Sequence, residues 1–273
     1  MLINKTSYKP NKSLATYVDR IYVLKHSGAF KLPAILPGTG LELLFHTHEP
    51  LLINNHKCDN GHVICPRNSI LHIDEFSDVS FISVRFKSGA FRHFSSIPFI
   101  ELNNQFASVE DIWGVKGKYF LEKLNEHHTI NDKIKCIESF LLKCLYDYHN
   151  KQNDKWDTIM HSLYKQYNSI SLKELAAYTN LSYRQFERNF KSQFGITPKK
   201  IQRIIRFEAT VKKILLNRNP GYLSTALDHG YYDQSHFINE FQFFTEEKPS
   251  NYFVTKNYDH HFYDKSIKAP ERY

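Results

Sequence analysis

The sequence has few of the features that mark secreted, membrane-spanning or zinc-binding proteins. Its 273 residues include only four cysteines, and no two of them have the two-residue spacing of a zinc knuckle, so we expect ordinary buried thiols. No run of about 18 apolar residues is present to cross a bilayer, and the first residues contain no apolar core of signal-peptide length. We therefore expect a cytoplasmic protein with no membrane partner.

Motifs of the common enzyme classes are also missing. We find no Gly-rich phosphate loop, no nucleophile elbow and no carboxylate pair with a suitable partner, so we expect no enzyme, no catalytic residue and no cofactor. Gly40, His46 and His48 match the opening of a cupin metal motif, G-x5-H-x-H, but the carboxylate that should follow is absent. We expect no metal there. A cupin-like enzyme or metal sensor in the first half of the chain remains the alternative.

The overall composition is that of a folded protein of two domains. Hydrophobic residues make up 41% and charged residues 23%, which is ordinary for globular chains, and the length is comfortable for two cores. The polar run 149–154 buries nothing and predicts the boundary. We expect a β-rich regulatory, effector or dimerisation domain at 1–150, a helical domain at 151–256 and a tail at 257–273, hence a two-domain α+β protein.

The first domain is predicted to be a small β-barrel or cupin-like sandwich with flanking helices. Short apolar or alternating segments between turn residues predict strands at 20–25, 41–45, 51–53, 63–65, 70–73 and 81–86. The interior, either packed solid or holding one small ligand, is expected to be lined by Leu43, Phe45, Ile53, Ile64, Ile73, Phe81 and Val84. An apolar stripe at 132–148 predicts a helix used for core packing or, as the alternative, for dimerisation.

Positive charge is concentrated in the second domain. Residues 1–150 hold 17 Lys and Arg against 15 Asp and Glu, whereas residues 151–256 hold 16 against 10. Such a field favours a polyanion, because each phosphate that is neutralised releases condensed counterions.

Residues 171–195 predict two short helices joined by a tight turn. Ser171 and Glu174 form a capping box, Asn180 tolerates a left-handed turn, and Ser182 caps the second helix. Phe186, Phe190 and Phe194 recur every four residues and predict its buried face, while its other face is basic. This arrangement is typical of a helix-turn-helix unit with a recognition helix.

The same layout returns about fifty residues later. Ala226 repeats the small residue Ala176, Gly230 marks the turn, and Asp233 caps a helix anchored by Phe237, Phe241 and Phe244. Between the two units, residues 198–217 predict a single helix that starts at a proline and carries its own apolar stripe. We expect this helix to hold the two units at a fixed separation.

These features resemble the DNA-binding domain of the AraC/XylS family of bacterial transcription regulators. The resemblance covers about residues 154–253, and its signature-like segment consists of Ala226, Gly230, Tyr231, Asp233, Gln234, Ser235, His236, Phe237, Phe241, Phe244, Pro249, Tyr252 and Phe253. The sequence departs from many relatives at 246–249, where they carry a glycine. The first domain resembles, more loosely, the β-rich regulatory domains of this family.

The resemblance implies a transcription factor, such as an activator, whose two recognition helices enter successive major grooves about 34 Å apart. Its partners would be double-stranded DNA and RNA polymerase, with a small-molecule effector and a homodimer as further partners. The candidates for base contacts are Tyr183, Arg184, Glu187, Arg188, Gln234, Ser235, His236 and Asn239. Arg184 and Arg188 suit guanine, whereas Gln234 and Asn239 suit adenine. His236 is equally interpreted as a packing residue. The candidates for phosphate contacts are Ser182, Lys191, Lys199, Lys200, Arg203 and Asp233.

Overall fold

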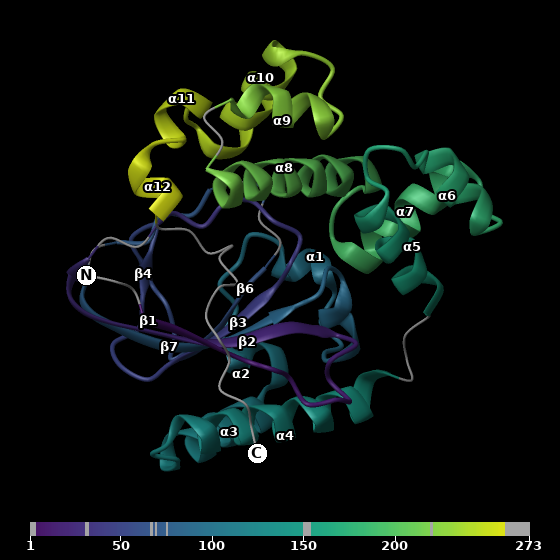
Figure 1. The fold of residues 1–273 in the computed structure, drawn as a ribbon. Helices are drawn as coiled ribbons and strands as arrows, with labels where there is room; N and C mark the ends of the chain where they lie inside the picture. The colour runs from purple at the N-terminus through teal and green to yellow at the C-terminus, as the bar shows by residue number, and fades with distance from the viewer. Residues whose placement is uncertain are drawn as a thin grey trace.

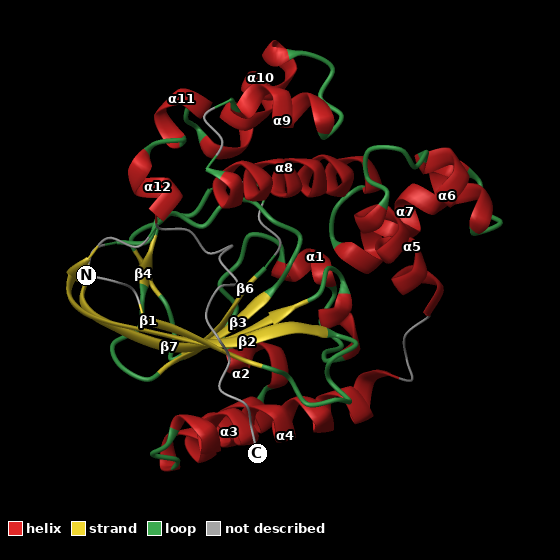
Figure 2. Cartoon of the chain, in the orientation of Figure 1, coloured by secondary structure: helices red, strands yellow, loops and turns green. Residues whose placement is uncertain are grey.

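The computed structural model describes residues 4–30, 33–65, 68, 70–74, 76–149, 154–218 and 221–259, and the structural statements below concern these residues. A β-sheet dominates the N-terminal half and helices make up the C-terminal half (Figures 1 and 2). The strands are β1 (Asn4–Tyr8), β2 (Val18–Phe30), β3 (Glu42–His46), β4 (Leu52–Ile53), β5 (His56–Lys57), β6 (Gly61–Ile64) and β7 (Phe76–Phe86). The helices are η1 (Ala90–His93), α1 (Phe99–Leu102), α2 (Val109–Trp113), α3 (Val115–Glu126), α4 (Ile130–Tyr148), α5 (Asp154–Lys165), α6 (Leu172–Tyr178), α7 (Tyr183–Phe194), α8 (Pro198–Asn217), α9 (Tyr222–Asp228), α10 (Gln234–Thr245), α11 (Pro249–Tyr252) and α12 (Thr255–Asp259).

The main sheet is antiparallel and open, with the strand order β1-β2-β7-β3-β6. Its edge strands β1 and β6 do not pair with each other in the described chain, so the predicted closed barrel is wrong. The residues expected to line one interior instead divide between two faces, because successive strand residues point to opposite sides. Leu43 and Val84 belong to one apolar cluster, and Ile64 and Phe81 belong to another.

Helices α2, α3 and α4 cover one face of the sheet. The stripe of α4 buries Ile134, Ile137 and Leu141, each 0% exposed, in the same cluster as Leu43 of β3. The prediction of core packing for this helix is therefore confirmed. In Figure 1, α3 and α4 lie below the sheet and α8 lies on its opposite side.

The other face is covered by the small hairpin β4–β5 and by the loops around it. Asn54 and Asn55, with φ of 49° and 62°, form the two-residue turn of this hairpin, as their type predicts. The strand predicted at 70–73 is wrong, because Leu71 and Ile73 make only isolated bridges. Strand β1 had no apolar alternation to predict it.

Three smaller expectations can be compared with the structure. Cys58, Cys65 and Cys144 are buried and Cys136 is half-buried, all as free thiols. Within the described residues, no helix has both the length and the apolar character that a membrane crossing requires. The boundary at 150–151 and most of the tail, 260–273, lie outside the described residues, so the division into domains stays a prediction.

Candidate nucleic-acid interface

Two capping boxes begin the helices of the first helix-turn-helix unit. Ser171 and Glu174 exchange backbone-to-side-chain hydrogen bonds at the start of α6, and Ser182 and Gln185 do the same at the start of α7. Asn180 has a φ of 57°, so the turn between the helices is left-handed there. The predicted caps at Ser171, Glu174 and Ser182 and the predicted left-handed turn at Asn180 are confirmed.

Aromatic packing fixes one side of α7. Phe186, Phe190 and Phe194 are at most 1% exposed and contact Trp156 of α5, with ring centroids 6.1–6.3 Å apart. Burial of three rings on one side of α7 leaves its opposite side facing solvent. Tyr183, Arg184, Arg188 and Lys191 are exposed there, and Glu187 is half-buried.

The second unit repeats this plan with different caps. The Asp233 carboxylate accepts the backbone N–H of His236 at 2.7 Å, which caps α10, and Gly230 makes the turn with a φ of 84°. Phe237, Phe241 and Phe244 are 0% exposed. Helix α9 begins at Tyr222, and Gly221 at its N-cap position provides no side-chain cap. Two units are therefore present, each with buried phenylalanine anchors and a second helix that exposes polar side chains.

Helix α8 joins the two units as a single continuous helix. It runs from Pro198 to Asn217, as predicted, and Thr197 caps it by accepting the backbone N–H of Lys200. Its buried residues belong to one cluster that also contains anchors of both units, including Phe190 and Phe241. One shared core thus supports both helix pairs.

The predicted contact residues of the second unit differ in solvent exposure. Gln234, Ser235 and Asn239 are exposed, whereas His236 is half-buried. The His236 ring packs edge-on against Tyr231, and its Nδ1 lies 3.3 Å from the backbone nitrogen of Tyr232. This geometry favours the packing interpretation of His236.

A concavity with a cavity volume of about 740 Å³ lies between α8 and α10. It brings together four of the predicted DNA-contact residues, namely Lys199, Arg203, His236 and Asn239. Ser182, Lys191, Lys200 and the predicted residues of α7 do not line it. The sequence does not predict the other polar residues of the lining, namely Tyr167, Asn168, Gln202, Arg206 and Glu240.

Among the missed residues, Glu240 joins α10 to α8. Its side chain is 3% exposed and pairs with Arg203 and Arg206 of α8. It also accepts the Tyr231 hydroxyl at 3.0 Å; burial and this negative charge raise the pKa of Tyr231. A charged residue within the apolar stripe made by Phe237, Phe241 and Phe244 is the sequence signal that could have revealed it.

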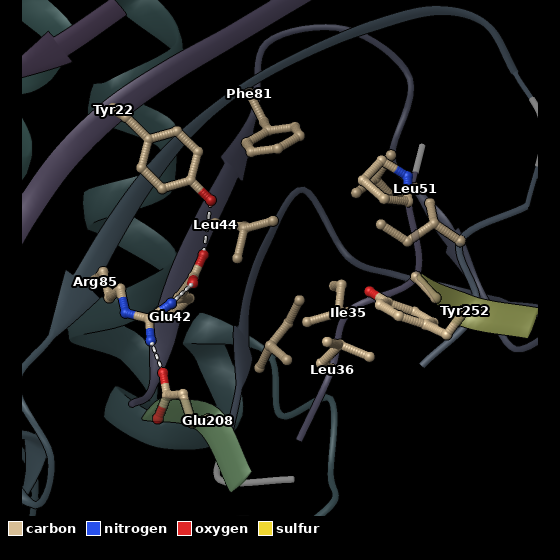
Figure 3. A pocket seen from close by; sticks show the side chains of 14 residues that line it. Tyr22, Ile35, Leu36, Glu42, Leu44, Leu51, Phe81, Arg85, Glu208 and Tyr252 are labelled. Atoms are coloured by element: carbon tan, nitrogen blue, oxygen red, sulfur yellow. Dashed lines mark hydrogen bonds and ion pairs between the residues drawn. The ribbon is translucent and has the colours of Figure 1, made fainter. Parts of the chain in front are cut away.

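The sheet meets the helical region at a second, mostly apolar pocket (Figure 3). Its polar end is formed by Tyr22, Glu42, Arg85 and Glu208, and Tyr252 lines it from α11. Arg85 binds Glu42 at 3.1 Å and Glu208 of α8 at 2.6 Å. Burial, together with the charge of Glu42, raises the pKa of Tyr22. The cavity volume is only about 30 Å³, which is room for about one water molecule.

The two histidines of the cupin-like pattern are not brought together. His46 is 8% exposed and stacks on His62 with ring centroids 5.1 Å apart, whereas His48 is exposed. Burial lowers the pKa of His46 to about 3 and that of His62 to about 4. The described residues include no group of three or more side chains suited to hold a metal ion.

Comparison with known families agrees with this geometry. The family model of a helix-turn-helix domain matches residues 175–254, which run from within α6 to just beyond α11. The capped helix pairs and the matched segment define this region as a helix-turn-helix DNA-binding domain. This domain, at residues 175–254, is of the AraC type that bacterial transcription regulators carry.

Other similarities concern the N-terminal region and the chain as a whole. A domain of unknown function, DUF6597, matches residues 6–108, and no curated protein matches the sequence. ToxT from Vibrio cholerae O395 matches with 12% identity over 85% of this chain and 96% of that chain, at a TM-score of 0.42. An unsaturated fatty acid-bound ToxT from Vibrio cholerae strain SCE256 matches with 12% identity over 90% and 96%, at a TM-score of 0.41. These superpositions are too loose to transfer residue roles.

Proposed function

We propose that this chain is a sequence-specific regulator that places α7 and α10 in successive major grooves of one duplex. The observation that carries the proposal is that one continuous helix, α8, supports two capped units whose second helices both expose polar or basic side chains. A rigid connection favours two adjacent sites over one, because the second unit then binds without a further loss of freedom. Arg184 and Arg188 are the base-reading candidates of α7, and Gln234 and Asn239 are those of α10.

The proposal is tested with the full chain and duplexes selected from random DNA. Affinity should fall steeply as salt rises. Arg188→Ala should relax discrimination at one base pair, by about 1–3 kcal/mol. Lys173→Ala is the matched control, because Lys173 is exposed on α6, outside the proposed recognition helix. This control should change affinity little and equally for all sequences. Equal affinity of the unaltered protein for selected and scrambled duplexes would contradict the proposal.

We also propose that the N-terminal sheet controls DNA binding through the junction pocket, where a small effector would act. Support comes from the direct contact of Arg85 in β7 with Glu208 in α8. The pocket is far below the roughly 300 Å³ of ordinary ligand sites, so an effector would have to separate the sheet from α8. RNA polymerase and a second copy of the chain stay predicted partners.

Leu36→Trp tests this control, because Leu36 lines the pocket and is 6% exposed. The larger side chain should push α8 away from the sheet and change DNA affinity, while the circular dichroism spectrum stays unchanged. Leu52→Trp is the control, since Leu52 is 39% exposed and outside the pocket lining. The same DNA affinity in Leu36→Trp, in Leu52→Trp and in the unaltered protein would contradict control through this pocket.

A further inference from the structure

The carboxylate of Glu240 stands beside the surface that is proposed to meet DNA. It belongs to α10 and lines the concavity that also contains Lys199, Arg203 and Asn239. A negative charge in such a place repels phosphate, so on charge alone it should weaken binding.

Glu240 is held by three donor side chains. Arg203 Nε lies 2.8 Å from its Oε2, and Arg206 Nη2 lies 2.8 Å and 3.0 Å from its two oxygens. The Tyr231 hydroxyl donates to Oε1 at 3.0 Å. Arg206 also lies over the Tyr231 ring, 4.4 Å from its centroid. Both oxygens are therefore satisfied, as a buried carboxylate requires.

The guanidinium of Arg203 is bound to the protein at Nε and is partly exposed to solvent. Its Nε is bound to Glu240, and its guanidinium carbon lies 5.1 Å from the Phe243 centroid and 5.6 Å from that of Phe244. The side chain is nevertheless 37% exposed. A guanidinium is planar, so fixing Nε and stacking the plane also fixes the direction of the two terminal nitrogens. Within the described chain, the only side-chain hydrogen bond of Arg203 is the one made by Nε.

We propose that Glu240 is a positioning residue that orients Arg203 toward a phosphate of the bound duplex. This inference rests on the proposed function, because it presupposes that the concavity faces DNA. A free arginine loses side-chain entropy when it binds a phosphate. Arg203 has already lost much of that freedom in the free protein. Glu240 thus strengthens DNA binding even though its own charge opposes it.

The sign of one substitution separates this role from simple electrostatics. Glu240→Gln removes a negative charge, so charge alone predicts tighter binding to DNA. Positioning predicts weaker binding, by about fivefold, because the neutral amide holds Arg203 less firmly. The measurement is the dissociation constant for the selected duplex, with thermal unfolding recorded to show that the variant is folded.

A double-mutant cycle tests whether Glu240 acts through Arg203. Arg203→Lys keeps the charge but cannot be held by a fixed fork, so it should also weaken binding about fivefold. In this background, Glu240→Gln should weaken binding no further. In a Lys199→Gln background it should keep its full effect, because Lys199 lines the same concavity without contacting Glu240. A general loss of structure would weaken binding in both backgrounds.

Two results would overturn the inference. One is unchanged or tighter binding by Glu240→Gln, and the other is an undiminished effect of that substitution in the Arg203→Lys protein. If Glu240→Gln does not fold, Arg203→Lys alone decides, and unchanged affinity in it overturns the proposal. Failure of the proposed function would look different, since the unaltered protein would then bind selected and scrambled duplexes equally.

Discussion

Arg85 Nη2 of the sheet lies 2.6 Å from Oε1 of Glu208 in the helix that joins the two helix-turn-helix units. The same guanidinium binds Glu42 through Nη1, and the side-chain exposures of Arg85, Glu42 and Glu208 are 12%, 10% and 7%. A single arginine therefore pairs with two buried carboxylates, one from the sheet and one from α8. Removing one partner from such a cluster leaves buried charge without compensation, which is far more costly than losing a surface pair.

Arg85→Met should lower the free energy of unfolding by about 3 kcal/mol, since both carboxylates would lose their cation. Glu208→Gln should cost less, because Arg85 keeps Glu42. Lys116→Met is the control, since it breaks an exposed pair with Asp147 and should change stability little. Urea unfolding of the three variants gives their free energies of unfolding, and the loss should be largest in Arg85→Met and smallest in Lys116→Met. Equal losses in Arg85→Met and Lys116→Met would contradict the structural role of the cluster.

Gly89→Ala should destabilise the contact between the sheet domain and α7. Gly89 has a φ of 77°, and a Cβ there would lie 2.6 Å from Cε1 of Phe194, which is buried and cannot move aside. We expect a loss of about 2 kcal/mol or more from the clash and the backbone strain together. Gly28→Ala is the matched control, because it has a φ of 98° but nothing within 4 Å. Its loss should be smaller, at about 1 kcal/mol, and thermal unfolding distinguishes the two.

Stability should fall as the solution becomes acidic, because His46 and His62 stay neutral in the folded chain. Their pKa values are lowered by burial to about 3 and about 4 from an ordinary value of 6.5. Below pH 6.5 the unfolded chain binds protons that the folded chain does not, so stability is lost as pH falls from about 6.5 toward about 4. Each histidine contributes about 1.4 kcal/mol per pH unit within this window.

His62→Phe should reduce this acid sensitivity, because it removes one of the two groups and also the like charge that disfavours protonation of His46. His48→Gln serves as the control, since His48 is exposed. Urea unfolding at pH 7.0 and at pH 5.0 gives the difference for each variant. An identical pH dependence in His62→Phe and the unaltered protein would show that this pair is not responsible.

Glu246→Gly should stabilise the protein by about 0.5–1 kcal/mol. Glu246 ends α10 with a φ of 60°, a left-handed conformation that is strained for residues with a Cβ and easy for glycine. Glu246→Ala keeps the strain and should give no such gain. Thermal unfolding compares them, and a gain in the alanine variant alone would exclude backbone strain as the cause.

The helix-turn-helix units could be predicted from sequence because their signals are local. Caps such as Ser171 and Ser182, and phenylalanines four residues apart, act within one or two turns of helix. The departure at 246–249 is also explained locally, since Glu246 adopts the backbone conformation that the missing glycine would favour. The exposure of Arg184 and Arg188 follows from the same helical spacing.

The sheet and the junction could not be predicted in the same way. Alternation shows which residues are buried but not whether the sheet closes. The sequence therefore predicts one interior for Phe81 and Val84, although they lie on opposite faces of the sheet. The pairing of Arg85 with Glu208 joins residues 123 positions apart, and no sequence pattern links them. Glu208 and Glu240 interrupt apolar stripes, which predicts burial with a partner but does not name the partner.

Helix α8 carries Arg203 and Arg206 toward α10 and Glu208 toward the sheet. Arg203 and Glu208 are five residues apart, which places them about 140° apart around the helix axis. The contact of α8 with the sheet and its contact with α10 are therefore coupled, because both are made by one continuous helix. Rotation of α8 about its axis would move Glu208 relative to the sheet and Arg203 relative to α10 at the same time. Under the proposed function, a change at the sheet would thus reach the DNA-binding surface directly through α8.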